Sequence, residues 1–598
     1  MKLKSLFLAF LLSLPGMAQQ KGLNIEHLSE THSLVRVQDA KKYLLLPIEE
    51  KAPEATIHVL KDAKQDQSFT ARLAINRIDY YVPFELDAYK GHCVILDVHN
   101  IADRAQTRTA QTDVCWNEIK LSDEFDTTNR ETYRPRYHFT PLYGWMNDPN
   151  GMVYKDGEWH LFYQYNPYAS VWGNMNWGHA VTKDLVHWDH LPVAIAPDGL
   201  GTVFSGSCVV DKDNTAGFGK NAIIAIYTSA GASQMQSLAY STDNGRTFQK
   251  YAGNPILTSD VVDFRDPNMF WNEKIKKWNL ILAAGQEMRI YSSPNLKDWK
   301  EESRFGLGYG AHGGVWECPD LFELPVEGTS ETKWVLVCNL NPGGPFGGSA
   351  TQYFVGDFDG YKFTCESKPS TCKWMDFGKD HYATVSFSNA PDNRRVVLAW
   401  MSNWEYATTV PTQQYRSSNS VPRDLGLYMK DGEHYLTVKP SAEMAAVRGT
   451  ETKKKVGNLS GSKLLKNVLA GKDDAAELTL SFEPSTAKVF GVELSNDRGE
   501  KVVLTYDLSK LQVSMDRTKS GRSDFSASFA AETSAPLEKQ DVYQLRLFLD
   551  RCSLEAFDGE GHFAMTNLLF PNEPYQHVRV FSQNGKTKVG AVTIYEIK

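Results

Sequence analysis

TKDLVHW, residues 182–188, is a polar turn that ends in an aromatic side chain, and it returns in variant form three times. The variants are STDNGRTF at 241–248, SSPNLKDW at 292–299 and, more weakly, DFDGYKF at 357–363. Their closing aromatics are spaced 60, 51 and 64 positions apart. This spacing suits one four-stranded blade per repeat, so it favours a β-propeller over coincidental hairpins in a β-sandwich. One more unit fits before Pro422, and we expect five blades.

Strand patterns continue on both sides of the repeats, and helical periodicity is almost absent, which predicts an all-β chain. A short helix around residues 442–447 is the exception. In chain order we expect a signal peptide at 1–18, an extra N-terminal accessory β-domain at 19–130, the five-bladed β-propeller catalytic domain at 131–436, a linker helix at 437–450 and a C-terminal β-sandwich at 451–598.

The first residues have the layout of a secretory signal. Lys2 and Lys4 precede an apolar run from Leu6 to Leu14, and small residues flank a cleavage point before Gln19. The run is too short to cross a bilayer, which argues against a membrane anchor. Because no cysteine follows it, lipid attachment is not indicated. We expect an exported, periplasmic or extracellular, soluble protein.

The composition excludes two classes of partner. Hydrophobic residues at 42% and charged residues at 23% are ordinary globular values. A net charge of -8 gives no reason to expect binding to nucleic acid or insertion into membranes. The eight cysteines lack metal-binding spacing; Cys93 with Cys115 or Cys365 with Cys372 could form disulfides, and buried thiols are an equal alternative. We expect no metal ion and no cofactor.

Three acidic motifs lie at similar numbers of residues before the closing aromatics, that is, at a similar phase of the repeats. Asp148 in WMNDPNG lies 40 residues before Trp188, Asp266 in RDP lies 33 before Trp299, and Glu317 in WECPD lies 46 before Phe363. A similar phase implies a similar place in successive blades. If that place is the innermost strand, the three carboxylates meet at one end of the propeller axis.

Converging carboxylates repel one another, which raises at least one pKa and creates a proton donor beside an ionised neighbour. Cleavage of a glycosidic bond needs this pair. Each motif alone is weak evidence, because an Asp before Pro is commonly a turn residue and a lone Glu can be a satisfied buried acid. The three motifs in order and in phase are much more specific.

At these residues the sequence resembles glycoside hydrolase family 32, which includes invertases, inulinases and levanases. The resemblance covers about residues 134–425 and, more loosely, the C-terminal sandwich. The matching segments are GWMNDPNG at 144–151, FYQYNP at 162–167, WGHA at 177–180, FSGS at 204–207, RDP at 265–267 and ECPD at 317–320.

The resemblance implies a retaining, double-displacement mechanism on β-fructosides. Asp148 would be the nucleophile, Glu317 the general acid/base, and Asp266 an ionised stabiliser of the transition state. Arg265 would keep a neighbouring carboxylate charged. The remaining candidates for substrate binding are Asn147, Gln164, Trp172, Ser205, Asp380 and Trp404. For Trp177 and Trp188 we favour packing between blades, and for His179 and His381 a metal role is improbable.

The expected activity is release of terminal fructose from levan or inulin, and of fructose from sucrose, with a fructan or fructo-oligosaccharide as partner. Endo-cleavage is the main alternative. A non-catalytic fructan-binding propeller is disfavoured because Asp148 and Glu317 are present, and an inverting arabinan or xylan hydrolase is disfavoured by the motifs. Linkage preference, the role of the N-terminal domain and the oligomeric state stay open.

Overall fold

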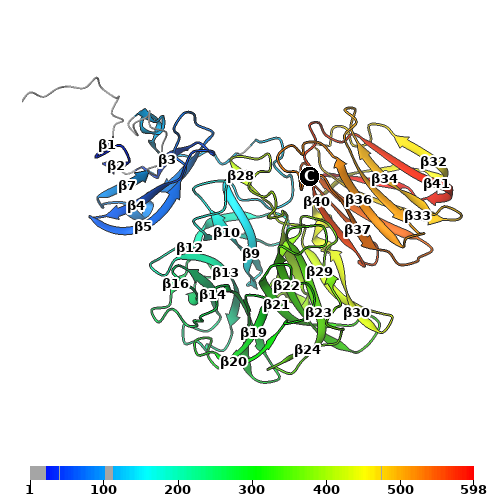
Figure 1. Ribbon diagram of the computed structural model, residues 1–598, viewed down its shortest axis with the longest axis horizontal. Helices are drawn as coiled ribbons and strands as arrows, with labels where there is room; N and C mark the ends of the chain where they lie inside the picture. Colours follow the sequence, from blue (N-terminus) through cyan, green and yellow to red (C-terminus); the bar gives the residue numbers. More distant parts are fainter. Residues whose placement is uncertain (1–21, 39–40, 101–111, 129, 473) are drawn as a thin grey trace, which may run out of the picture. The chain divides into compact units, whose positions relative to one another are not determined.

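A computed structural model describes residues 22–38, 41–100, 112–128, 130–472 and 474–598 (Figure 1). The predicted signal peptide lies outside these residues. The chain forms two compact units: the first reaches Thr127 and includes Pro167–Ala169, and the second holds Thr128–Asn166 and Ser170–Lys598. The predicted all-β class is confirmed, because strands make up nearly all of the regular structure.

The first unit consists of two small sheets. One has the order β1 (Leu23–His27), β2 (His32–Val37), β7 (Val94–Asn100), β4 (Ala55–Lys61) and β5 (Lys64–Ala71). The other has the order β6 (Tyr80–Glu85), β3 (Tyr43–Ile48) and β8 (Lys120–Ser122). The side chains of β4 alternate, so that Ala55, Ile57 and Val59 enter the core while Thr56 and His58 face outward. This period of two is what a half-buried strand requires.

The second unit contains five sheets arranged as propeller blades, with β16, β20, β24 and β30 at the rim (Figure 1). The first blade consists of β9 (Gly144–Lys155), β10 (Glu158–Asn166), β11 (Asn176–Thr182) and β12 (Asp189–Ile195), and the second of β13 (Thr202–Asp211), β14 (Ala222–Ala230), β15 (Gln234–Ser241) and β16 (Gln249–Lys250). The third blade consists of β17 (Phe264–Asn272), β18 (Lys277–Ala284), β19 (Glu287–Ser293) and β20 (Lys300–Phe305), and the fourth of β21 (Val315–Pro325), β22 (Thr332–Asn341), β23 (Ala350–Phe358), β24 (Phe363–Cys365) and β25 (Lys373–Trp374). The fifth blade consists of β26 (Tyr382–Ser386), β27 (Val396–Trp400), β29 (Arg423–Lys430) and β30 (Glu433–Pro440). The five predicted blades are therefore present.

The repeated turn phrase is explained by local hydrogen bonds. The Asp184 carboxylate accepts from the backbone N–H groups of Val186 and His187 at 3.0 and 2.8 Å. Asn295 and Asp359 cap the equivalent turns through the same two backbone positions. An Asx side chain stabilises such a turn by replacing a backbone acceptor, which is why the phrase could be recognised from sequence.

The propeller is closed by a short strand from far along the chain. Tyr415–Arg416 forms β28, which pairs in parallel with β9 of the first blade. The Arg416 guanidinium donates to the carbonyl oxygens of Ser170 and Thr408, both at 2.8 Å. A buried guanidinium needs several acceptors, and backbone carbonyls of the first blade and of the closing segment supply them.

Beyond the propeller, Ala442–Val447 forms a 3-10 helix at the position of the predicted helix, and the C-terminal β-sandwich follows. Its strands are β31 (Arg448–Lys454), β32 (Gly457–Leu465), β33 (Ala476–Pro484), β34 (Val489–Ser495), β35 (Lys501–Asp507), β36 (Gln512–Lys519), β37 (Glu532–Pro536), β38 (Tyr543–Asp550), β39 (Ser553–Asp558), β40 (Ala564–Leu568), β41 (His577–Val589) and β42 (Val592–Ile597). Cys93, Cys365 and Cys372 carry free thiols, so neither disulfide that the sequence allowed is formed.

A network of buried charges joins the propeller to the sandwich. Arg423 of β29 donates to Asp376 at 2.8 Å and to Glu555 of β39, and all three side chains are buried. His138 lies between Asp550 and Glu555, with each ring nitrogen 2.8 Å from one carboxylate. Because both ring nitrogens face acceptors, the imidazole carries two protons and a positive charge. The interface therefore pairs its buried acids with cations.

Candidate active site

The innermost strand of every blade is interrupted at a similar point. On β9, Asn147 and Asp148 together stand opposite the single residue Gln164 of β10. β17 carries one extra residue between Arg265 and Asn268, and β21 one between Glu317 and Asp320. A bulge of this kind breaks the ladder and turns a side chain away from the sheet faces. Asp148 and Asp266 stand at such interruptions, and Glu317 directly precedes one.

The bulges hold three non-glycine residues in the left-handed region. Asp266 has φ 64°, Cys318 has φ 42° and Ala383 of β26 has φ 53°. Each such residue costs about 1–3 kcal/mol and persists only where the surroundings impose it. Pro267 and Pro319, which follow Asp266 and Cys318, lack an N–H. No hydrogen bond between strands is lost through them, because the pairing is already broken at these positions. The Asp-Pro and Cys-Pro pairs of the sequence are thus bulge residues.

One expectation about the blades is corrected. Asp148, Asp266 and Glu317 lie on the first, third and fourth blades, whereas the phase argument placed them on successive blades. The second blade has the same bulge at Ser205, between Phe204 and Gly206. That blade therefore contributes a hydroxyl in place of a carboxylate.

Asp148 is held from both sides by donors. Its Oδ1 accepts from Asn147 Nδ2 at 2.9 Å, and its Oδ2 accepts from Ser205 Oγ at 2.8 Å and from Cys318 Sγ at 3.3 Å. Trp145 Nε1 donates to Asn147 Oδ1 at 2.8 Å, which fixes the orientation of that amide. Three donors to one carboxylate leave it little freedom to rotate. Asp148 is therefore held in a fixed orientation.

Glu317 differs because its surroundings favour a proton. Its Oε1 accepts from Arg265 Nη2 at 3.0 Å, and its Oε2 accepts from the Tyr382 hydroxyl. Burial nevertheless raises the pKa of Glu317, since Arg265 only partly opposes it and the charge of Asp148 adds to it. A carboxyl group with a raised pKa beside an ionised one is the arrangement for proton donation.

Asp266 is the most deeply buried acid of the three, at 4% exposure. Its Oδ2 accepts from the backbone N–H of Cys318 at 2.9 Å, and Arg265 Nε lies 3.9 Å away. Burial, with the charges of Glu317 and Asp148, raises the pKa of Asp266 to about 7 in spite of Arg265. Arg265 and the Cys318 N–H favour the ionised form that the sequence analysis predicts for Asp266, whereas burial opposes it.

The other sugar-binding candidates differ in exposure and in their contacts. Gln164 is buried, and its Nε2 has no hydrogen-bond partner among the described residues. Trp172 is 46% exposed and meets Phe204 edge to face at 6.0 Å. Trp404 is half-buried and stacks on Trp145 at 5.9 Å. Gln164 offers an unused donor and Trp172 an open ring face, which are the two features that sugars bind.

The structure corrects the predicted position of Asp380. The sequence predicted a residue bordering the pocket, but Asp380 is fully buried. Its Oδ1 accepts from the Tyr406 hydroxyl at 2.5 Å, and its Oδ2 accepts from Arg517 of the sandwich and from the Leu568 N–H at 2.8 Å. Both oxygens are occupied and neither is exposed, so Asp380 contributes to the propeller–sandwich interface. Trp177, predicted to pack, is fully buried and donates to the Phe204 carbonyl at 3.0 Å.

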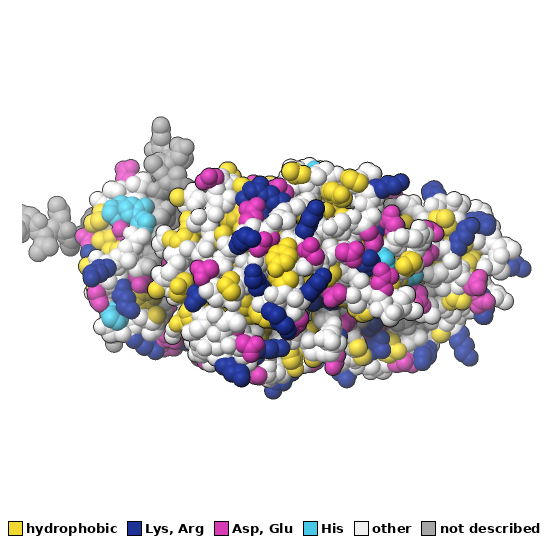
Figure 2. All heavy atoms as spheres, turned by 90° about the horizontal axis from the view of Figure 1, so that it is seen from below, with side chains coloured by type: hydrophobic (Ala, Val, Ile, Leu, Met, Phe, Trp, Pro, Cys, Tyr) yellow, Lys and Arg dark blue, Asp and Glu magenta, His cyan; other side chains and the backbone are white. Residues whose placement is uncertain are grey.

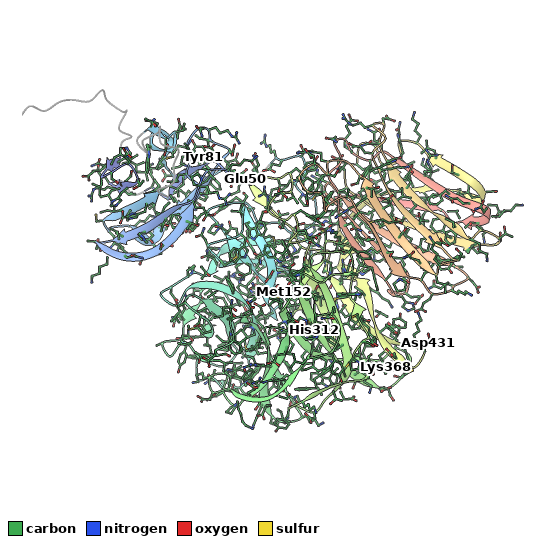
Figure 3. All side chains as sticks on the ribbon, in the orientation of Figure 1. Glu50, Tyr81, Met152, His312, Lys368 and Asp431 are labelled. Carbon is green, nitrogen blue, oxygen red and sulfur yellow. The ribbon has the colours of Figure 1, made fainter. Side chains whose placement is uncertain are left out.

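Two contributors were missed by the sequence analysis. Cys318 touches both Asp148 and Asp266 through its Sγ, and Tyr382 donates to Glu317. His312, labelled in Figure 3, has a packing contact instead: it lies on the loop before β21 and stacks on Trp316 at 4.8 Å. Cys318 adjoins a predicted acid in sequence and could have been considered. Tyr382 comes from the fifth blade, and no local pattern marks it.

Family models match most of the chain. A family model described as the glycosyl hydrolases family 32 N-terminal domain matches residues 138–440, and one described as the family 32 C terminal matches 443–596. Residues 29–137 match a domain of unknown function, DUF4980. The model matches therefore divide the chain into three stretches.

Individual relatives cover most of the chain. A levanase of Bacillus subtilis is 48% identical over 481 residues, which are 78% of this chain and 71% of the levanase. An extracellular exo-inulinase of Aspergillus niger is 39% identical, over 78% of this chain and 95% of its own. The crystal structure of exo-inulinase from Aspergillus awamori superposes with a TM-score of 0.74 at 37% identity, over 79% of this chain and 99% of that chain.

Proposed function

The chain belongs to glycoside hydrolase family 32, and from this premise we propose that it releases terminal fructose with Asp148 as nucleophile and Glu317 as general acid/base. It is a glycoside hydrolase of the β-fructofuranosidase type. The observation that carries the assignment of roles is the contrast between two carboxyl groups: Asp148 accepts three hydrogen bonds, whereas burial raises the pKa of Glu317.

In the first step an Asp148 oxygen attacks the fructosyl C2, and the bond from C2 to the leaving oxygen breaks. Glu317 gives its proton to that oxygen, and an ester joins Asp148 to C2. In the second step Glu317, now ionised, takes a proton from water while the water oxygen attacks C2 and Asp148 departs. Free fructose leaves, and both groups return to their starting states.

Asp266 and Arg265 support this cycle. The Arg265 guanidinium bonds Glu317 and lies near Asp266, so it offsets the charge that Glu317 acquires when it loses its proton. Asp266 is aligned by the Cys318 N–H and can accept hydrogen bonds from sugar hydroxyls. Gln164, Trp172 and Trp404 complete the proposed pocket for one terminal fructose.

Fructans, levan or inulin, are the proposed polymeric substrates, with exo-cleavage as the mode. The relatives named levanase and exo-inulinase support this class of substrate. We also propose that the enzyme is exported. Among the described residues, no helix combines the length and apolarity needed to cross a membrane. Mass analysis of the secreted protein, with Gln19 as the expected first residue, tests the predicted cleavage.

Product analysis tests the proposal. Levan and inulin are each incubated with the enzyme, and the products are separated during the first few per cent of the reaction. Fructose alone supports exo-cleavage, whereas early oligosaccharides would establish endo-cleavage instead. Asp148→Ala should reduce kcat by at least about 10⁴-fold, as expected when a covalent nucleophile is removed. Activity near that of the wild type would overturn the assignment of Asp148.

A further inference from the structure

The first unit carries a cluster of histidines that takes no part in the proposed fructan hydrolysis. Figure 2 shows histidine side chains, in cyan, gathered on the surface of this unit. The residues involved lie on neighbouring strands of one sheet: His32 on β2, Asp97 and His99 on β7, and His58 on β4. We propose that His32, Asp97 and His99 bind a divalent transition-metal ion, with Zn²⁺ as the expected species and His58 as a further ligand.

The strand register places all four side chains on one face. His32 stands directly opposite His99, and His58 directly opposite Asp97. Asp97 and His99 are two positions apart on one strand, so their side chains project on the same side. The opposite face, with Val35, Ile57 and Val98, packs in the core. The arrangement is therefore fixed by the backbone of the sheet.

The ligand atoms converge on one point. His32 Nε2 lies 2.6 Å and His99 Nε2 lies 3.1 Å from the same oxygen, Oδ1 of Asp97. The candidate ligand atoms of these three residues lie within 4.8 Å of one another. Around a tetrahedral Zn²⁺ with bonds of about 2.0–2.1 Å, ligand atoms stand about 3.3 Å apart. Small side-chain rotations therefore suffice to place an ion between them.

His58 adds an observation independent of this triad. Its ring meets that of His99 at 5.5 Å, edge to face. Its Nδ1 is buried and has no hydrogen-bond partner among the described residues. A buried ring nitrogen without a partner is costly to maintain, and coordination to a metal removes that cost. His58 thus offers the nitrogen that a fourth position needs.

The chemistry of the cluster selects the kind of ion. Imidazole nitrogens with one carboxylate suit Zn²⁺ and its first-row neighbours, whereas Ca²⁺ and Mg²⁺ prefer oxygen ligands. The side chains of His32 and His99 are 31% and 44% exposed, so an ion can enter from solvent. Bound there, it would link β2, β7 and β4.

The test is calorimetric titration of the untagged, chelator-treated full chain with ZnCl₂. We expect one equivalent to bind, with a weakening of about 100-fold or more in His99→Ala and in Asp97→Asn. His92→Ala is the matched control, because His92 and Asp62 form an isolated pair at 2.6 Å on the same unit. Its affinity should equal that of the wild type. Tetrahedral Co²⁺ absorption that disappears in His99→Ala would identify the ligands directly.

Far-UV circular dichroism and fructose release by the variants confirm that each remains folded, since no residue of the cluster belongs to the active site. The proposal is overturned if the full chain binds no Zn²⁺. It is equally overturned if His99→Ala and Asp97→Asn bind Zn²⁺ as tightly as the wild type.

Discussion

Two clusters of buried carboxylates in the second unit have opposite electrostatic character. The active site gathers Asp148, Asp266 and Glu317, and the one guanidinium among them, Arg265, lies beside Asp266 and Glu317. The propeller–sandwich interface pairs its acids with several cations. The acids are Asp376, Asp380, Asp550 and Glu555, and the cations are His138, Arg423 and Arg517. The interface acids are the more completely buried, since the Glu317 side chain is 22% exposed and that of Glu555 is fully buried. The ratio of acids to cations also differs.

The pKa values follow that ratio. In the active site burial raises the pKa of Glu317 and takes that of Asp266 to about 7. At the interface burial acts in the same direction, yet neighbouring cations and hydrogen bonds bring the pKa values of Asp376, Asp550 and Glu555 below their usual range. A shortage of cations therefore distinguishes the acids that can exchange protons from those that hold the fold together.

The largest expected effect comes from matched amide substitutions in the two clusters. Glu317→Gln removes the proton donor and should lower kcat/KM by about 10³–10⁴-fold. Its free energy of unfolding should stay within about 1 kcal/mol of the wild type or rise, because a repelled carboxylate is lost. Glu555→Gln should instead destabilise the fold. Denaturant unfolding and initial-rate kinetics measure both, and equal destabilisation by the two variants would contradict the comparison.

Next in size is the removal of an interface cation. Arg423→Met leaves Asp376 and Glu555 buried without their partner, which should cost about 3–5 kcal/mol of stability. Arg246→Met is the control, because its ion pair with Glu158 is 41% exposed on the arginine side. Exposed pairs contribute about 0–1 kcal/mol. Chemical denaturation of both variants gives the two values, and similar losses would show that the buried network is not special.

A smaller effect concerns pH. Burial opposes the charge on His138, but hydrogen bonds to Asp550 and Glu555 raise its pKa to about 9, from an ordinary value of 6.5. The unfolded chain loses this proton first, so stability should fall as pH rises from about 6.5 to 9, by up to about 3 kcal/mol. His138→Gln should be less stable at pH 6.5 and flatter over this range. Denaturation at several pH values tests the slope.

The smallest effect expected is a shift of the pH–activity profile. The Tyr382 hydroxyl bonds the Glu317 carboxylate and favours its ionised form. Tyr382→Phe should raise the pKa of Glu317. The protonated form of Glu317 then persists to higher pH, and the alkaline limb of the kcat/KM profile moves to higher pH with it. An unchanged or lowered limb in the profile of kcat/KM against pH would contradict this role.

The sequence predicted the blades because the turns that close them use local chemistry. Asp184 and its counterparts bond backbone groups two and three positions away. The convergence of Asp148, Asp266 and Glu317 could also be predicted, since a repeated fold places a similar phase at a similar point. In both cases the signal lies within one repeat.

Contacts between distant segments could not be predicted. Asp380 lies in a stretch that suggests a pocket residue, but its partner Arg517 is 137 positions away in the sandwich. Nothing within the blade reveals that pairing. Tyr382 reaches Glu317 across 65 positions, and His32 and Asp97 are equally far apart. Such pairs depend on how blades and sheets are placed, which local patterns do not encode.

The bulges on the inner strands also bear on how this architecture can change. Hydrogen-bonded pairing resumes on both sides of each interruption, from Asn268 on β17 and from Asp320 on β21. The residue at the interruption takes no part in the regular pairing between strands, so its side chain can vary. The second blade carries Ser205 where the third carries Asp266. Chemistry and scaffold are thus separable in evolution: a blade can exchange its reactive group without losing its sheet.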